Sequence, residues 1–144
     1  MSRRGTTPTS RAPDAIARGP AWPFALAGIA ALAVAAIRTV LGEGTDLAPI
    51  LAALDGTPMG ALVQINWYAL SAIMAGLGIA LLWAIALSRP ARRAIALIAG
   101  FAFGVVTLLF MGFTWATTGS PFTYMPWLPL TFTTVLCFNA ARSA

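Results

Sequence analysis

Residues 57–88 decide the fold: they read TPMGALVQINWY from 57 to 68 and ALSAIMAGLGIALLWAIALS from 69 to 88. The run from Tyr68 to Leu87 contains no charged residue, and about twenty such residues cross a hydrocarbon core of roughly 30 Å as a helix. The Thr57-Pro58 pair predicts the helix start, because a hydroxyl caps the first turn and proline has no N–H to satisfy there. This stretch therefore predicts a membrane-spanning helix whose first turns stand outside the apolar core.

The composition of the whole chain agrees with this interpretation. Of its 144 residues, 59% are hydrophobic and 9% are charged, which excludes a soluble globular domain. Histidine is absent and Cys137 is the only cysteine. A haem held by histidine, a Cys/His zinc site and an intramolecular disulfide are therefore excluded, and we expect no metal and no cofactor. In an apolar helix, Cys137 is expected to be a small buried hydrophobe.

Four apolar runs predict an all-α fold, a transmembrane four-helix bundle over residues 21–141. The expected spans are about 21–41, 64–88, 94–113 and 126–140. Residues 1–20 are rich in Arg, Thr, Ser, Pro and Gly, and we interpret them as a disordered basic tail. A cleaved signal peptide is the alternative for the first run, since Ala33-Val34-Ala35 resembles a cleavage site.

The charges predict the orientation of the bundle. All nine basic residues are arginines: four in the tail, three in the turn at 88–93, one near the C-terminus, and Arg38. Cytoplasmic loops carry an excess of basic residues, so both termini are expected in the cytoplasm. The outer connection holds Glu43, Asp46 and Asp55. The Ala- and Arg-rich, Lys-free usage suits a bacterium, so the expected location is the bacterial inner (plasma) membrane. Nucleic-acid binding is not expected, because topology accounts for the arginines.

A short helix is expected in the first outer loop, over about residues 46–55. Leu47, Ile50, Leu51 and Leu54 follow a helical spacing, with Thr45 or Asp46 as cap and Asp55-Gly56 as the end. Two turns are too short to span a bilayer. The segment is expected to lie flat at the interface or to form a lid over the bundle.

Small residues predict where helices approach closely. Gly100 and Gly104 form a GxxxG motif in the third span, and Ala75 and Gly78 lie on one face of the second. The motif is compatible with packing inside the chain and with a homodimer. We take these four residues as the candidate helix-packing set.

Candidate ligand-binding residues gather at the outer end of the predicted bundle. Arg38 lies one turn before the end of the first span, where it can snorkel, pair with Glu43 or Asp46, or face an anionic ligand group. The other candidates are polar or aromatic: Gln64, Trp67, Tyr68, Ser71, Trp127 and Thr131. They form an interfacial belt or the rim of a pocket for a small amphiphilic molecule, bordered by Gln64, Tyr68 and Trp127.

The sequence offers little for catalysis or proton-coupled transport. No span contains a carboxylate, and no nucleophile stands beside a base, so we predict that the protein is not an enzyme. Small multidrug exporters have a similar size and span number, but the first span here lacks their essential glutamate.

The layout resembles small bacterial membrane proteins of the DoxX-like and related four-helix families. The resemblance rests on span number, length and Asn66-Trp67-Tyr68 before a long Ala/Leu/Gly run. It covers most of 21–140 and implies no catalytic residues. The expected function is that of a non-enzymatic inner-membrane protein acting through helix packing, as a homo-oligomer or an accessory subunit of a membrane complex. The alternative is a binder or carrier of a small amphiphilic, lipid-like ligand at the outer-leaflet rim.

Overall fold

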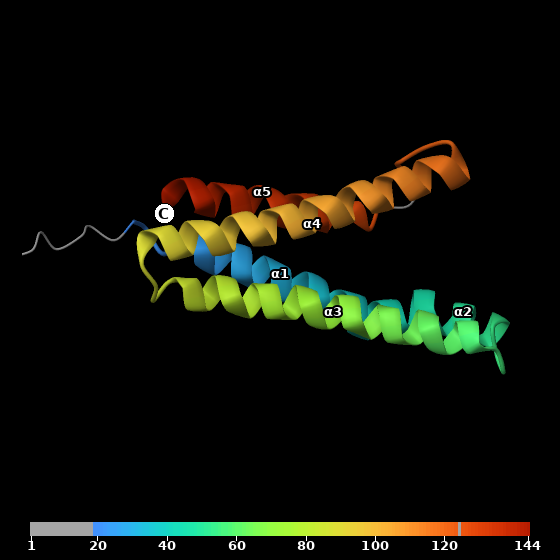
Figure 1. Cartoon of the computed structure of the whole chain (residues 1–144). Coiled ribbons are helices and arrows are strands. Elements are labelled where there is room, and N and C mark those ends of the chain that lie inside the picture. Colours follow the sequence, from blue (N-terminus) through green and yellow to red (C-terminus); the bar gives the residue numbers. More distant parts are fainter. Residues whose placement is uncertain (1–18, 124) are drawn as a thin grey trace, which may run out of the picture.

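The computed structural model describes residues 19–123 and 125–144, and this part of the chain is helical without a strand (Figure 1). Most of the tail predicted to be disordered lies outside the described residues. The elements are α1 (Trp22–Gly42), the π-helical segment η1 (Glu43–Leu47), α2 (Ala48–Ala53), α3 (Pro58–Ala84), α4 (Arg89–Thr118) and α5 (Trp127–Ser143).

Local chemistry explains where the long helices begin and end. The Thr57 hydroxyl accepts a hydrogen bond from the Gly60 N–H at 3.3 Å and Pro58 follows in the first turn, which confirms the predicted start of α3. Helix α4 stops at Gly119, whose φ of +73° is a left-handed conformation. Its N–H donates to the Trp115 carbonyl at 2.8 Å and closes the last turn.

One expected break is absent. The helix predicted over about residues 46–55 corresponds to α2, but it is not set off from the first span, because α1, η1 and α2 follow one another without a loop from Trp22 to Ala53. No helix begins at Thr45 or Asp46, so neither residue acts as a cap. Gly42 keeps a right-handed helical backbone, and the chain continues from it as the π-helical segment η1. The predicted end holds: the turn comes at Gly56, which has a φ of +71°.

Two antiparallel hairpins form the bundle. Helix α1 packs along α3 and α4 packs along α5, while α1 also contacts α5 and α3 contacts α4. Figure 1 shows that the two hairpins lie close together near the C-terminus and diverge toward the far end. The core between them consists mainly of small side chains and a few large ones: Phe24, Ala27, Ala31, Ala35, Met74, Leu81, Ala84, Ala96, Ala99, Phe103, Leu130, Cys137, Ala140 and Ala141.

Glycines set the spacing within each hairpin. A Cβ on Gly28 would lie 2.9 Å from the Gly78 carbonyl oxygen, and a Cβ on Gly78 would lie 3.0 Å from the Gly28 oxygen. The α1 and α3 backbones therefore touch at this crossing. In the other hairpin, Gly100 lies against the Phe138 ring and Gly104 against Thr134, so the GxxxG face of α4 packs on α5 of the same chain.

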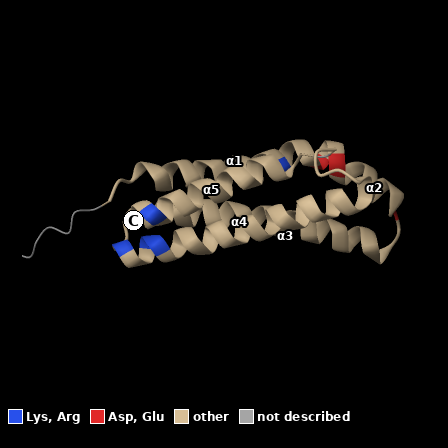
Figure 2. Ribbon diagram, turned by 90° about the horizontal axis from the view of Figure 1, so that it is seen from above, with Lys and Arg blue, Asp and Glu red and all other residues tan. Residues whose placement is uncertain are grey.

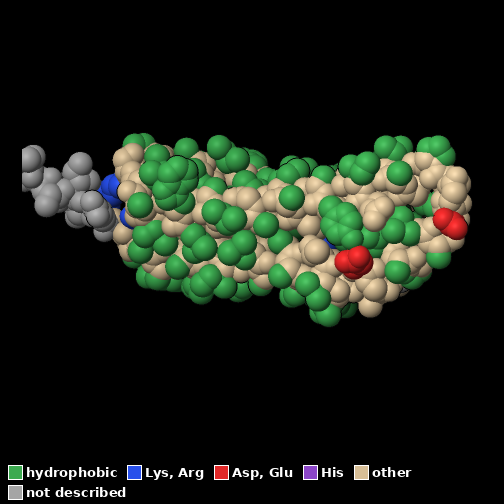
Figure 3. All heavy atoms as spheres, turned by 90° about the horizontal axis from the view of Figure 1, so that it is seen from below, with side chains coloured by type: hydrophobic (Ala, Val, Ile, Leu, Met, Phe, Trp, Pro, Cys, Tyr) green, Lys and Arg blue, Asp and Glu red, His purple; other side chains and the backbone are tan. Residues whose placement is uncertain are grey.

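The molecular surface is apolar along its length. Large side chains are exposed on all four long helices, among them Ile29, Ile73, Leu108 and Phe132 (Figure 3). The helical runs Trp22–Ala53 (32 residues), Pro58–Ala84 (27 residues) and Arg89–Thr118 (30 residues) are long and apolar enough to cross a membrane. These features are those of a helical membrane protein, in which lipid covers such a surface.

Apart from Arg38 on α1, which lies near the acidic residues, the arginines and the carboxylates of the described residues lie toward opposite ends of the bundle (Figure 2). Arg89, Arg93 and Arg142 lie at one end, here called the basic end, where Gly19 packs directly against the Ser143 backbone. The acidic end carries Glu43, Asp46 and Asp55. The start of α1 and the C-terminus therefore lie side by side at the basic end.

Arg92 has a structural role that its place in an arginine-rich turn did not reveal. It is only 3% exposed, and its Nε donates to the Ala84 carbonyl at 3.1 Å. The guanidinium also donates to the carbonyls of Ile85 and Gly19 and lies over the Phe24 ring. Because the Ala84 and Ile85 carbonyls lie at the end of α3, Arg92 caps that helix, which stops at Ala84 rather than at the predicted Ser88.

Candidate functional site

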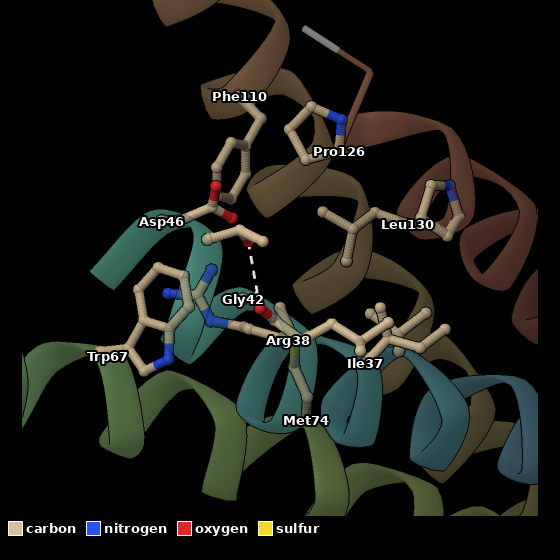
Figure 4. A pocket seen from close by; sticks show the side chains of 13 residues that line it. Ile37, Arg38, Gly42, Asp46, Trp67, Met74, Phe110, Pro126 and Leu130 are labelled. Atoms are coloured by element: carbon tan, nitrogen blue, oxygen red, sulfur yellow. Dashed lines mark hydrogen bonds between the residues drawn. The ribbon is translucent and has the colours of Figure 1, made fainter. Parts of the chain in front are cut away.

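Arg38 stands out among the charged side chains of the described residues because it lies within an apolar run, one turn before the end of α1. It is half-buried on α1, and its guanidinium carbon lies 3.9 Å from the centre of the Trp67 ring on α3. Figure 4 shows the side chain stretched across the gap between these helices toward the acidic end. A cation over an indole face is stabilised by about 0.5–2 kcal/mol, the larger values applying where water is excluded. The contact fixes the guanidinium in place.

The backbone of α1 makes room for the Trp67 ring at Gly42. A Cβ at this position would lie 2.8 Å from the Trp67 Cζ2 atom, closer than carbon atoms approach without displacement. The missing side chain lets the indole lie flat against α1, one turn beyond Arg38. Gly42 thus positions the Trp67 ring. A Cβ on the nearby Gly44 would meet no atom within 4 Å.

The π-helical segment brings Asp46 to the same side of the helix as Arg38. In an uninterrupted α-helix, eight residues would place the two side chains about 80° apart around the axis. A π-bulge absorbs one residue, which reduces the offset to about 20° in the other direction. Figure 4 shows both side chains at the same cavity, with the Thr45 hydroxyl donating to the Leu41 carbonyl at 3.0 Å beside them.

A cavity of about 230 Å³ surrounds these groups at the acidic end, where the hairpins diverge. Its opposite wall is apolar and comes from α4 and the start of α5, with Phe110, Pro126 and Leu130 facing Arg38 (Figure 4). The complete lining is Val34, Ile37, Arg38, Leu41, Gly42, Thr45, Asp46, Trp67, Met74, Phe110, Pro126, Pro129 and Leu130. All four long helices therefore contribute to one site.

Two N–H donors in this site are buried without an acceptor among the described residues: the Nε of Arg38 and the Nε1 of Trp67. No carboxylate oxygen of the described residues lies within 4.0 Å of the guanidinium nitrogens, although Asp46 is near enough to act on the charge of Arg38. Leaving a buried donor unpaired costs about 1–3 kcal/mol, and more for a charged group. The two residues that meet at the cavity therefore each carry a buried N–H donor without an acceptor among the described residues.

The candidate residues named from sequence do not all meet here. Arg38 and Trp67 come together in the cavity. Tyr68 and Ser71 lie instead along a groove between α1 and α3 lined by small residues, including Ala75. The Tyr68 hydroxyl donates to the Glu43 carboxylate at 2.9 Å, and the Ser71 hydroxyl to the Trp67 carbonyl at 3.0 Å.

The remaining candidates also lie away from the Arg38 cavity. Gln64 is exposed near the start of α3. The Trp127 indole donates to the Pro121 carbonyl at 2.7 Å and packs edge-on against Phe122, which fixes the loop before α5. Thr131 donates to the Trp127 carbonyl within its own helix. Gln64, Tyr68 and Trp127 therefore do not border the cavity that contains Arg38.

Several residues of the site have no sequence signal of their own. Phe110 and Leu130 look like ordinary apolar positions, and Pro126 and Pro129 like helix-start residues. Asp46 was considered as a partner for Arg38, and the structure places it at the same cavity without a direct contact. One sequence signal could have indicated irregular helical geometry here: two glycines, Gly42 and Gly44, stand beside the acidic residues at the end of the apolar run.

Comparison of the chain with protein-family models, curated proteins and solved structures gave no match. The resemblance to DoxX-like proteins therefore stays a prediction. Within residues 19–123 and 125–144, no three His, Cys, Asp or Glu side chains are grouped to hold a metal ion. The chemistry of the site is that of a fixed cation, two free N–H donors, one carboxylate and apolar walls.

Proposed function

We propose that this chain is a membrane protein of four spans, with the basic end in the cytoplasm. Three helical runs have the necessary length, and α5, with 17 residues, reaches about 26 Å, at the lower limit for a span. The arginines at the basic end support this orientation because cytoplasmic loops are rich in basic residues. For a bacterial inner membrane, the acidic end then faces the outside.

We propose further that the protein binds the headgroup of an amphiphile in the Arg38 cavity. The observation that carries this proposal is the Arg38 guanidinium, a charged donor group that lines a mostly apolar cavity and whose Nε–H has no acceptor among the described residues. A charge inside a membrane helix is costly and commonly serves a site. An anionic or strongly polar headgroup atom would supply the missing acceptor.

The expected depth of Arg38 in the bilayer matches the level of lipid headgroups. From Trp22, which is exposed at the basic end, Arg38 lies about 24 Å along the helix axis. In a hydrocarbon core of about 30 Å, this places it just inside the far edge, where ester and phosphate groups of lipids begin. Ile37 and Leu41 line the same cavity and are exposed on the surface, so an attached chain can continue onto the apolar face of α1.

The helix-packing hypothesis has less support than binding. Its motif, Gly100 and Gly104, lies against α5 of the same chain. An accessory subunit or homo-oligomer would have to use another surface. The cavity contains no nucleophile beside a base, so we propose binding or carriage of the amphiphile and not its chemical conversion.

Native mass spectrometry of protein reconstituted with defined lipids tests the proposal. The protein is extracted gently from nanodiscs of phosphatidylethanolamine and phosphatidylglycerol, and retained lipids are counted for wild type, Arg38→Gln and Arg93→Gln. Arg93 is exposed at the basic end and provides a control that removes the same charge. We expect wild type and Arg93→Gln to retain a defined lipid, and Arg38→Gln to lose it. Equal retention by all three proteins would overturn the proposal.

A further inference from the structure

We infer that the bound headgroup is zwitterionic, with its anionic group at Arg38 and a primary ammonium group at Asp46. The inference rests on the proposed function and specifies the ligand class of the same site. Arg38 and Asp46 line one cavity but lie too far apart for a direct ion pair, since no guanidinium nitrogen is within 4.0 Å of a carboxylate oxygen. Two opposite charges at one cavity, held apart, match a ligand that carries both.

A purely anionic headgroup fits the same cavity less well. It would gain the contact with Arg38, but the Asp46 carboxylate at the same cavity would repel it. A neutral headgroup would accept from Arg38 and leave Asp46 without a partner. The charges of the two residues cancel, and a zwitterion satisfies both without adding net charge to the edge of the bilayer.

The other acidic residue of this region is already engaged. Glu43 accepts the hydrogen bond of Tyr68, a residue of the groove between α1 and α3, and Glu43 is not part of the lining of the Arg38 cavity. Asp46 is thus the carboxylate that the π-helical segment turns toward Arg38. A regular α-helix would have avoided the irregular hydrogen bonding of η1, and π-bulges occur frequently at functional sites.

The size of the cavity selects a headgroup and excludes a whole lipid. At about 30 Å³ for each water molecule of liquid volume, 230 Å³ corresponds to about seven or eight waters. A phosphate joined to a two-carbon amine is smaller than this and fits within the cavity. Sites that enclose complete drug-sized ligands start at about 300 Å³, so the acyl chains must lie outside, against the exposed side chains of Ile37 and Leu41.

Competition between lipids tests the inference. Nanodiscs contain equal amounts of phosphatidylethanolamine and phosphatidylglycerol, which share the phosphate and differ in the ammonium group. Native mass spectrometry gives the ratio of the two lipids retained. A partly exposed ion pair at Asp46 predicts an ethanolamine preference of about two- to fivefold in wild type. Asp46→Asn should abolish this preference, and Asp46→Glu should keep it. Asp55→Asn is the matched control, because Asp55 lies at the acidic end outside the cavity lining.

The outcomes separate the two proposals. If Arg38→Gln lowers retention of both lipids but Asp46→Asn leaves their ratio unchanged, the zwitterion inference fails and headgroup binding stands. If Arg38→Gln changes neither lipid, both fail. Soluble glycerophosphoethanolamine, added at the concentration of the lipid, is expected to leave the retained lipid in place, because it lacks the apolar chains. Displacement by this compound would overturn the assignment to a membrane lipid.

Discussion

Replacing Gly78 by alanine tests the contact that holds α1 against α3. The added methyl carbon would lie 2.9 Å from the Leu32 Cγ, 3.0 Å from the Gly28 carbonyl oxygen and 3.2 Å from the Ala31 Cβ. Carbon atoms prefer a separation of about 3.5–4.0 Å. The Leu32 side chain can rotate away, but the Gly28 oxygen belongs to the backbone, so α1 itself must move. Forcing an extra methyl group into such a contact costs about 1–3 kcal/mol.

Gly76 supplies the matched control on the same helix. A Cβ there would meet no atom within 4 Å. Both substitutions gain the same helix propensity, about 1 kcal/mol for alanine over glycine, so this gain cancels when the two variants are compared. The difference between Gly78→Ala and Gly76→Ala therefore isolates the steric cost, and we expect Gly78→Ala to be about 1–3 kcal/mol less stable.

The assay is reversible unfolding in mixed micelles, with sodium dodecyl sulfate as the denaturant and circular dichroism as the readout. Both variants are measured in the same detergent and at the same protein concentration, so that any association contributes equally. Free energies of unfolding that agree within about 0.5 kcal/mol would refute the close backbone contact at Gly78. A third variant, Gly28→Ala, should be non-additive with Gly78→Ala, because both methyl groups act on the same crossing.

Two further predictions use matched pairs. Arg92→Gln removes the charged donor that caps α3 and should lower the free energy of unfolding by about 2–4 kcal/mol. Arg93→Gln changes an exposed arginine one residue away and should alter the free energy of unfolding little. Equal unfolding midpoints of the two variants in the same detergent titration would contradict the capping role. Gly42→Ala should push the Trp67 ring out of its place and reduce the lipid retained in native mass spectrometry, while Gly44→Ala, whose Cβ meets open space, should retain as much as wild type.

The helices were predictable because their determinants are local. An uncharged run of about twenty residues specifies a span, and a hydroxyl before proline specifies a start, as at Thr57. The two hairpins follow from short connections between neighbouring helices. The role of Arg92 was not predictable, because its acceptors include Gly19, which is distant in sequence, and because a basic turn already had an explanation in topology.

The candidate site was predictable only in part. Arg38 stands out in any reading of the sequence because it is a charge within an apolar run. Its partner Trp67 belonged to a polar and aromatic cluster, and no periodicity shows which member of that cluster faces α1. The direction of Asp46 depends on η1, since one residue absorbed in a π-helical turn rotates everything beyond it by about 100°. Patterns based on regular helix spacing fail at such a point.

The distribution of small and large side chains explains why a cavity forms at the acidic end. Toward the basic end, alanines such as Ala27, Ala96 and Ala140 let the two hairpins approach, and Arg92 joins the end of α3 to the start of α4. Toward the acidic end, the rings of Phe110, Pro126 and Pro129 face the opposite hairpin instead. Their rigid shapes cannot fill the widening space. The divergence of the hairpins thus opens a cavity at the level of Arg38, where its guanidinium can meet a headgroup.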